Sequence, residues 1–301
     1  MAIDDIIEAM SGTQNAPDDG ATLEPFDKEN WIEKKGIERE QVFALMNNTA
    51  ERIASNPELF LSYLDVESKF PRYSVGNILL IAAQNADATK LADYETWKQN
   101  GVYIKKNEKG ILLLEPGNEY TRGDGSTGVK FAVKRVFDIS QTTSREQPKK
   151  PAPIDERKLI QALITDAPCK LKMDDSISST QLAIYQPEDK TVHIRHGLSG
   201  EQMFRAVSKE LALARMDKGQ YRRADCSFRA EAISYLLCRR FHIEPNAGAF
   251  DRMPESLSGK EGKEIKAELE KIRETSNEMG LSISHTLNKL QKPPDRGDDA
   301  R

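Results

Sequence analysis

The chain has 301 residues, of which 38% are hydrophobic and 31% are charged. That length exceeds what one small hydrophobic core usually serves, so we expect two domains. The longest apolar runs, such as NILLIAA, are far too short to span a bilayer, and the N-terminus lacks the basic start and apolar run of a signal peptide. Three cysteines are too few for a disulfide framework, so the composition predicts a cytoplasmic protein with no membrane partner.

The net charge of −4 conceals two regions of opposite sign. Residues 1–30 contain eight acidic residues and one lysine, whereas residues 97–135 contain eight Lys/Arg and four acidic residues. We expect residues 1–36 to be an acidic, partly flexible segment with a short amphipathic helix at 3–10. The basic region leaves room for a local site that binds a polyanion.

The first half continues with helices. Apolar residues recur at helical spacing from about 37 to 69, and Pro57 is expected to divide this stretch into two helices. Ser74 suits the N-cap of a third helix, which reaches about Asn85. A short helix around DYETWKQNG would end at Gly101.

The pattern then changes to strands. VYI, GILLLEP and VKFAVKRVFDI are rich in β-branched or long apolar residues and are separated by the turn sequences KKNEKG and GNEYTRGDGSTG. Residues 144–153 are rich in proline and lysine and predict a stiff linker between domains.

The second half is predicted to contain a short sheet and several helices. The strands lie near CKLKM and in a hairpin, QLAIYQPEDKTVHIRH, that turns at PEDK. The expected helices and the closing segments are 155–166, 200–217, 225–243, 260–280, a last element GLSISHTLNKL, and a disordered tail at 291–301.

These elements predict an α+β fold with two domains. Residues 37–143 would combine helices with a small antiparallel sheet. Residues 154–290 would form a mostly helical domain with a short sheet.

The first domain carries aromatic and basic residues close together in sequence. Single-stranded nucleic acid is held by bases stacked on aromatic rings and by Lys or Arg on the phosphates. The candidates for stacking are Tyr73, Trp97 and Tyr103. The candidates for phosphate contacts are Arg72, Lys98, Lys105, Lys106, Lys109, Lys134 and Arg135. The alternative is that the aromatic rings belong to the core and the lysines form a solvated face.

Four linked motifs in this domain resemble the N-terminal domain of the ArdC-type antirestriction family. The motifs are Tyr73-Ser74-Val75-Gly76-Asn77, Thr96-Trp97 with Gly101, Lys105 to Ile111, and Phe137 to Thr142. The resemblance covers about residues 40–143. It implies a domain that binds single-stranded DNA, serves a mobile or conjugative element and protects entering DNA from restriction. Ser74 and Asn77 stay open between a DNA contact and a structural role, since Ser74 also suits a helix cap.

The same family continues into a zincin-like metallopeptidase domain, and the matching helix here contains AVSKELALARM. A zinc helix of this type carries His-Glu-x-x-His, with both histidines on one face. Lys209, Glu210 and Leu213 occupy those positions, and the resemblance assigns Glu231 on the next helix to the third ligand. Leu213 has no donor atom, and the Lys209 ammonium repels a dication. One carboxylate is too few for a catalytic zinc site.

The chain contains other residues of metal-ligating type. His193 and His196 flank a predicted strand, where an offset of three residues places them on opposite faces. Cys238 and His242 are spaced i, i+4 on a helix, but a helix-end histidine beside a buried cysteine is the commoner arrangement. Lys209 could pair with Glu210 or Glu231, or point to solvent.

The sequence therefore predicts a single-stranded-DNA-binding, antirestriction-like protein with a catalytically inactive pseudo-metallopeptidase domain, no cofactor and no metal. Single-stranded DNA is the expected partner, with a host-encoded or element-encoded protein as a further one. Two alternatives remain: a zinc metallopeptidase with rearranged ligands, and an interaction protein that grips a host factor through the pseudoprotease domain.

Overall fold

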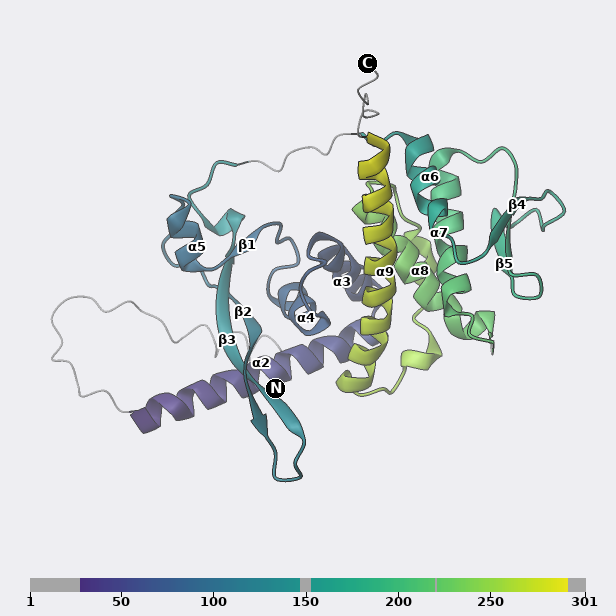
Figure 1. Cartoon of the computed structure of the whole chain (residues 1–301). Helices are drawn as coiled ribbons and strands as arrows, with labels where there is room; N and C mark the ends of the chain where they lie inside the picture. Colours follow the sequence, from purple (N-terminus) through teal and green to yellow (C-terminus); the bar gives the residue numbers. More distant parts are fainter. Residues whose placement is uncertain (1–27, 147–152, 220, 292–301) are drawn as a thin grey trace, which may run out of the picture. The chain divides into compact units, whose positions relative to one another are not determined.

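The computed structural model describes residues 28–146, 153–219 and 221–291. The chain divides into two compact units, which are Met1–Pro148 with Glu255–Lys266, and Lys149–Pro254 with Ala267–Arg301. Each unit combines helices with a three-stranded sheet, which confirms the α+β class (Figure 1). Within the described ranges no helix has both the length and the apolar character needed to cross a membrane.

Several expectations fall on residues that the structure does not describe. They are the helix at 3–10, most of the acidic segment, most of the linker at 144–153 and nearly all of the tail. The domain bounds stay a prediction.

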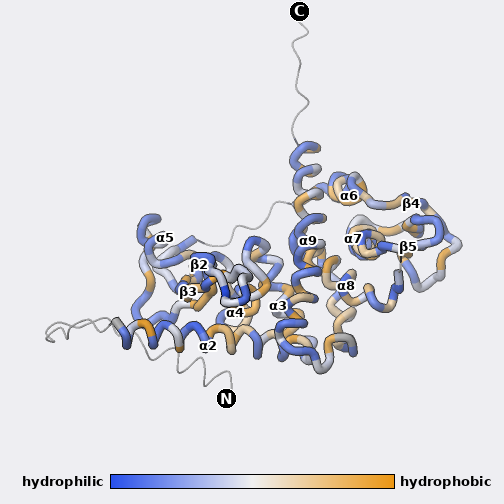
Figure 2. Tube along the Cα trace, turned by 60° about the horizontal axis from the view of Figure 1, so that its bottom comes forward, coloured by the Kyte–Doolittle hydropathy of each residue, from blue (hydrophilic) through white to orange (hydrophobic). Residues whose placement is uncertain are grey.

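The first unit contains helices, a 3-10 turn and strands in the order α2 Lys28–Ser55, α3 Pro57–Lys69, α4 Val75–Gln84, β1 Leu91–Ala92, α5 Tyr94–Gln99, β2 Ile111–Thr121, β3 Thr127–Asp138 and η1 Ile139–Gln141. Along α2, hydrophobic and hydrophilic residues alternate (Figure 2). The apolar side chains of α2, α3 and α4 form a core that includes the fully buried Leu45, Phe60, Leu64 and Ile78. Each such side chain contributes about 1.5–3 kcal/mol by leaving water.

Local signals explain where these helices begin. The Asn56 side chain accepts a hydrogen bond from the Leu59 amide at 3.1 Å, and Pro57 occupies the first turn of α3. This confirms the division at Pro57. The Ser74 hydroxyl lies 3.4 Å from the Asn77 amide, so Ser74 is the N-cap of α4 as expected.

The sheet of the first unit has the order β1-β3-β2 and is antiparallel. β2 and β3 form a long hairpin (Figure 1) in which Ile111 pairs with Val136. Only the first four residues of β2 are buried, and the rest of the strand is exposed. The inner half of the hairpin therefore completes the core, while the outer half is mostly exposed, apart from a contact between Phe131 and Phe43 of α2.

The second unit contains α6 Glu156–Thr165, β4 Lys170–Met173, β5 Ala183–Gln186, β6 Thr191–Ile194, α7 Gly200–Met216, α8 Arg223–Arg240, η2 Ala247–Phe250 and most of α9 Gly262–Gln291. The 3-10 turn η3 Glu255–Leu257 and the start of α9 belong to the first unit. Its sheet has the order β4-β6-β5, with β4 parallel and β5 antiparallel to β6. α7 and α8 pack closely because small residues line their contact. The hydroxyls of Ser208 and Ser234 lie 2.8 Å apart, and Ala212 and Ala230 are fully buried.

Three predicted elements differ from the observed ones. α2 begins at Lys28 and includes residues that were assigned to the acidic segment, since the Glu- and Lys-rich run 33–40 favours helix. The expected strand VYI is reduced to one bridge, Ile104 to Thr142, because the turn after it follows directly. The last two expected elements are one helix, α9, since Gly280 does not interrupt the hydrogen bonds of a helix with a well-packed face.

Candidate functional site

An exposed basic turn lies on the first unit and comprises residues 103–109. Tyr103 is 58% exposed, and Lys105, Lys106 and Lys109 are all exposed. Asn107 has φ 66°, a left-handed conformation that asparagine tolerates well, and this closes the turn. The turn therefore offers one aromatic face and three ammonium groups within seven residues.

The basic turn is held in place by the segment after β3. The Thr143 amide donates to the Tyr103 carbonyl at 2.8 Å, and the Lys105 amide donates to the Gln141 carbonyl at 2.9 Å. The Gln141 side chain donates to the Lys109 carbonyl at 2.8 Å. Two of the motifs that carry the resemblance thus lie side by side. Lys105 is itself engaged, since its ammonium donates to the Ser140 carbonyl at 2.7 Å.

Asp138 anchors the segment that holds the turn. Asp138 is only 2% exposed. Its carboxylate accepts hydrogen bonds from the backbone amides of Thr89, Lys90 and Ser140 at 2.7–2.9 Å. Burial alone would raise the pKa of Asp138, but the hydrogen bonds from Ser140, Lys90 and Thr89 hold it below its ordinary value. Asp138 is therefore an ionised structural residue.

Trp97 lies in the core of the first unit. It is 3% exposed, and its indole N–H donates to the Phe137 carbonyl at 2.9 Å. No ring face is open to a base in this arrangement, so the burial matches the alternative in which the aromatic residue belongs to the core.

Asn77 also serves the fold in this structure. Its side-chain amide accepts from the Leu114 amide at 2.8 Å and donates to the Leu114 carbonyl at 2.9 Å. Gln84, two turns further along α4, does the same with Leu112 at 2.9 and 3.0 Å. Together they satisfy the outer edge of β2, where a backbone would otherwise lack partners.

The other predicted contacts are distributed over the unit. Arg72 is exposed, whereas Arg135 is half-buried and pairs with Glu38 at 2.7 Å. Lys98 lies 6.0 Å from the centre of the Tyr94 ring. Tyr94 is 49% exposed, and the sequence analysis did not include it among the stacking candidates. Its i, i+4 spacing from Lys98 on a short helix could have indicated that the two side chains are neighbours.

A cleft of about 350 Å³ brings three of the predicted residues together, namely Tyr73, Asn77 and Lys134. They come from the start of α4 and from β3, far apart in sequence. Lys134 bridges Asp93 at 3.1 Å and Glu115 at 3.3 Å at the rim of the cleft. The charge of Lys134 is therefore largely used within the protein.

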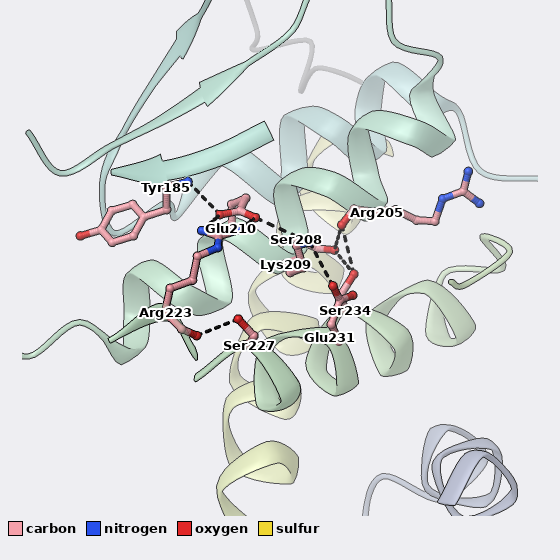
Figure 3. Close-up of polar contacts among 9 residues, drawn as sticks. All are labelled: Tyr185, Arg205, Ser208, Lys209, Glu210, Arg223, Ser227, Glu231 and Ser234. Atoms are coloured by element: carbon pink, nitrogen blue, oxygen red, sulfur yellow. Dashed lines mark hydrogen bonds and ion pairs between the residues drawn. The ribbon is translucent and has the colours of Figure 1, made fainter. Parts of the chain in front are cut away.

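In the second unit, α7 carries Lys209 and Glu210, and α8 carries Arg223 and Glu231. These four charged residues lie close together (Figure 3). Glu210 is fully buried, and both its oxygens accept from the Arg223 guanidinium, at 2.6 and 2.9 Å. It also accepts the Tyr185 amide of β5 at 2.8 Å. Burial alone would lower the pKa of Arg223, but the bonds to Glu210 raise it. The buried carboxylate is thus satisfied by a bidentate ion pair.

Lys209 pairs with Glu231, at 3.0 Å, and lies 3.9 Å from Glu210. Of the arrangements left open by the sequence, the structure therefore has the Glu231 pair. Leu213 is fully buried. A cleft of about 560 Å³ adjoins these groups and is also lined by Leu182, Arg205 and Tyr235.

The remaining ligand candidates are separated. His193 is buried and contacts Asp174 at 2.8 Å, while the exposed His196 contacts Asp175 at 2.9 Å. Cys238 is buried in α8, whereas His242 is exposed beyond the end of that helix, with φ 60°. Cys238 and His242 therefore do not share one helix face.

The solved structures that share this fold include two of the antirestriction protein ArdC from plasmid R388. The metal-free structure has a TM-score of 0.51 at 15% identity and covers 82% of this chain and 99% of that chain. The Mn(II)-bound structure has a TM-score of 0.53 at 13% identity, with the same coverage. The resemblance inferred from sequence is confirmed at the level of the fold. No protein-family model and no curated protein matches the chain.

The described residues at the positions that the sequence resemblance assigns to zinc do not fit a divalent ion. At the α7 positions, Lys209 brings a positive charge and Leu213 brings no donor atom. Throughout the ranges that the structure describes, no group of three or more His, Cys, Asp or Glu side chains could hold a metal. A divalent ion needs three or more protein ligands in such a site.

Proposed function

We propose that this protein binds single-stranded DNA through its first unit and acts as an antirestriction protein of a mobile element. The observation that carries the proposal is the basic turn. Tyr103 offers an exposed ring, Lys106 and Lys109 are exposed beside it, and hydrogen bonds to residues 141–143 fix the turn. Stacking and phosphate neutralisation are the two contributions that hold single strands without strong sequence preference.

The antirestriction role is supported by the shared fold with ArdC from plasmid R388. A protein that coats an entering single strand would act in the cytoplasm of the recipient cell, before the second strand is made.

The second unit is proposed to be a non-catalytic relative of a metallopeptidase. The support is chemical, because Glu210 forms an ion pair with Arg223 and Glu231 forms one with Lys209. A peptidase of this kind needs a carboxylate free to take a proton from a metal-bound water. Here that carboxylate is buried and accepts three hydrogen bonds.

A second role is favoured by the cleft of about 560 Å³ that persists beside these residues. Leu182 and Tyr235 give it apolar surface, and Arg205 gives it a cation that bonds only a backbone carbonyl among the described residues, that of Glu244. A protein partner could use this surface without any chemistry taking place. Binding of a host factor that survives Lys209→Ala and is lost with Arg205→Glu would support this role.

Substitutions in the basic turn test the DNA-binding proposal. Tyr103→Ala should weaken single-strand binding by about 1–3 kcal/mol through lost stacking. Lys106→Glu/Lys109→Glu should also weaken it and flatten the log–log salt slope by about 1.4, as two phosphate contacts disappear. Fluorescence anisotropy with a labelled oligonucleotide measures both.

The matched control is Lys170→Glu/Lys218→Glu, which makes the same charge change at two exposed positions of the second unit. Its affinity and salt slope should stay near those of the unmodified protein. Equal losses in the two double variants would mean that net charge, and not the basic turn, governs binding.

A further inference from the structure

The cleft of about 350 Å³ in the first unit has apolar walls and a polar rim. Leu91, Leu113 and Val136 contribute the apolar surface. Small-molecule pockets run from about 300 to 1,000 Å³, so this cleft suits one small planar ring system and not a pair of stacked ones.

Tyr73 closes one side of the cleft. Its ring is half-buried and rests edge-on against Phe70, with centroids 5.9 Å apart and planes at 75°. Burial raises the pKa of the Tyr73 hydroxyl, which stays protonated at neutral pH. The fixed ring offers a surface on which a flat aromatic ligand can stack.

The rim of the cleft presents hydrogen-bond acceptors. Lys134 lies between Asp93 and Glu115, whose side chains are 31% and 57% exposed. Hydrogen bonds from Thr96 and Lys134 lower the pKa of Asp93 from 3.8 to about 2, so it is ionised at neutral pH. Two carboxylates against one ammonium leave the rim with an excess negative charge, which disfavours a phosphate inside the cleft.

We propose that this cleft takes one unstacked base of a bound single strand and prefers bases that carry an exocyclic amine. This rests on the proposed function. The apolar walls and Tyr73 receive the ring, while Asp93 and Glu115 accept from its amine. Carboxylates only accept hydrogen bonds, and they pair with the amino group of cytosine, whereas thymine presents a carbonyl at that position. The sugar-phosphate backbone stays outside the cleft.

The test compares oligo(dC) with oligo(dT), two single-stranded pyrimidine probes of equal length, by fluorescence anisotropy. The unmodified protein should bind oligo(dC) about tenfold more tightly or better, as expected for one hydrogen bond to a charged acceptor. Asp93→Asn/Glu115→Gln should remove the preference, because an amide can also donate to the thymine carbonyl. Asn retains the capping role of Asp93 at α5, so the fold should survive.

Two further measurements keep the outcomes separable. A single 2-aminopurine within the oligo(dC) strand should be brighter when bound to Tyr73→Leu than when bound to the unmodified protein, because stacking on the Tyr73 ring quenches its fluorescence and leucine removes that ring. Tyr103→Ala, outside the cleft, should weaken both oligonucleotides and leave their ratio unchanged. Equal or tighter binding of oligo(dT), or a ratio that the Asn/Gln variant does not change, would overturn the base pocket while leaving DNA binding intact. Failure to bind either strand would overturn both proposals.

Discussion

At the scale of single residues, the fully buried Glu210 has its hydrogen-bonding capacity used within the second unit. The Arg223 guanidinium neutralises it through two hydrogen bonds, and the Tyr185 amide adds a third. Glu210 is the buried partner, and removal of Arg223 would leave its charge uncompensated, so the pair helps to hold α7 against α8. Glu231 is held similarly by Lys209. Two side-chain cations, Arg223 and Lys209, thus pair with the two carboxylates that the sequence resemblance assigns to a metal site.

This arrangement predicts the metal content of the protein and of a designed variant. The purified protein should contain no stoichiometric zinc, because Glu231 is a single carboxylate beside an ammonium. Lys209→His/Leu213→His should bind about one zinc per chain, since the two imidazoles share a helix face with Glu231 opposite. Each single substitution should bind far less. Plasma mass spectrometry on the four proteins measures this.

Circular dichroism confirms folding, which matters because Leu213 is fully buried. Zinc in the unmodified protein would revive the peptidase with rearranged ligands. A folded double variant without zinc would show that Glu231 does not occupy the third-ligand position.

At the scale of elements, side chains from outside the sheet hold β2 and β3 in position. Asn77 and Gln84 of α4 bond the backbone of β2 at Leu114 and Leu112. Trp97 of α5 bonds the end of β3 through the Phe137 carbonyl. Asp138 then joins β3 to residues 89–90 and to η1. The basic turn depends on these contacts, because residues 139–143 hold it.

Asp138 makes the stability of the first unit depend on pH. Its folded pKa lies below its ordinary value, so it contributes stability that is present above about pH 3.9, its unfolded pKa, and is lost as pH falls through the folded pKa. Asp138→Asn should lower the free energy of unfolding by about 2 kcal/mol at pH 7 through weakened hydrogen bonds. The difference in unfolding free energy between the variant and the unmodified protein should shrink in acid, because the unmodified protein then loses the contribution of the ionised Asp138.

Urea denaturation at neutral and acidic pH measures both effects. Asp87→Asn is the matched control, since Asp87 is exposed and close in sequence to the residues that Asp138 contacts. A deficit that stays constant down to acidic pH would mean that Asp138 acts through its shape and not its charge.

Element by element, much of the first unit follows from local signals. Pro57 and Ser74 place helix starts correctly because caps are local chemistry. The side of α5 that faces the core is not local: Trp97 is buried and Tyr94 exposed only because β3 lies beside Trp97. The same limit applies to Asn77, whose partner Leu114 is far along the chain. Site residues are therefore harder to predict than element bounds.

At the scale of the whole molecule, a similar fold is kept with very little sequence identity. The chain and ArdC from plasmid R388 share 13–15% identity over 82% of this chain. Many residues in the motifs that carry the resemblance make backbone contacts within the first unit, as Asn77, Trp97, Asp138 and Gln141 do. Such contacts explain why short motifs could reveal the fold. They do not by themselves identify a surface that binds a ligand.

The most direct test of the central proposal is the affinity of the unmodified protein for a single strand and for the corresponding duplex, measured by anisotropy at about 50 and 200 mM salt. We expect the single strand to bind more tightly, because its bases are free to stack on exposed rings. Its Kd should rise roughly twentyfold across that range, as three neutralised phosphates give a log–log slope of about −2. Equal affinity for the two forms, or an affinity insensitive to salt, would contradict single-strand binding by the first unit.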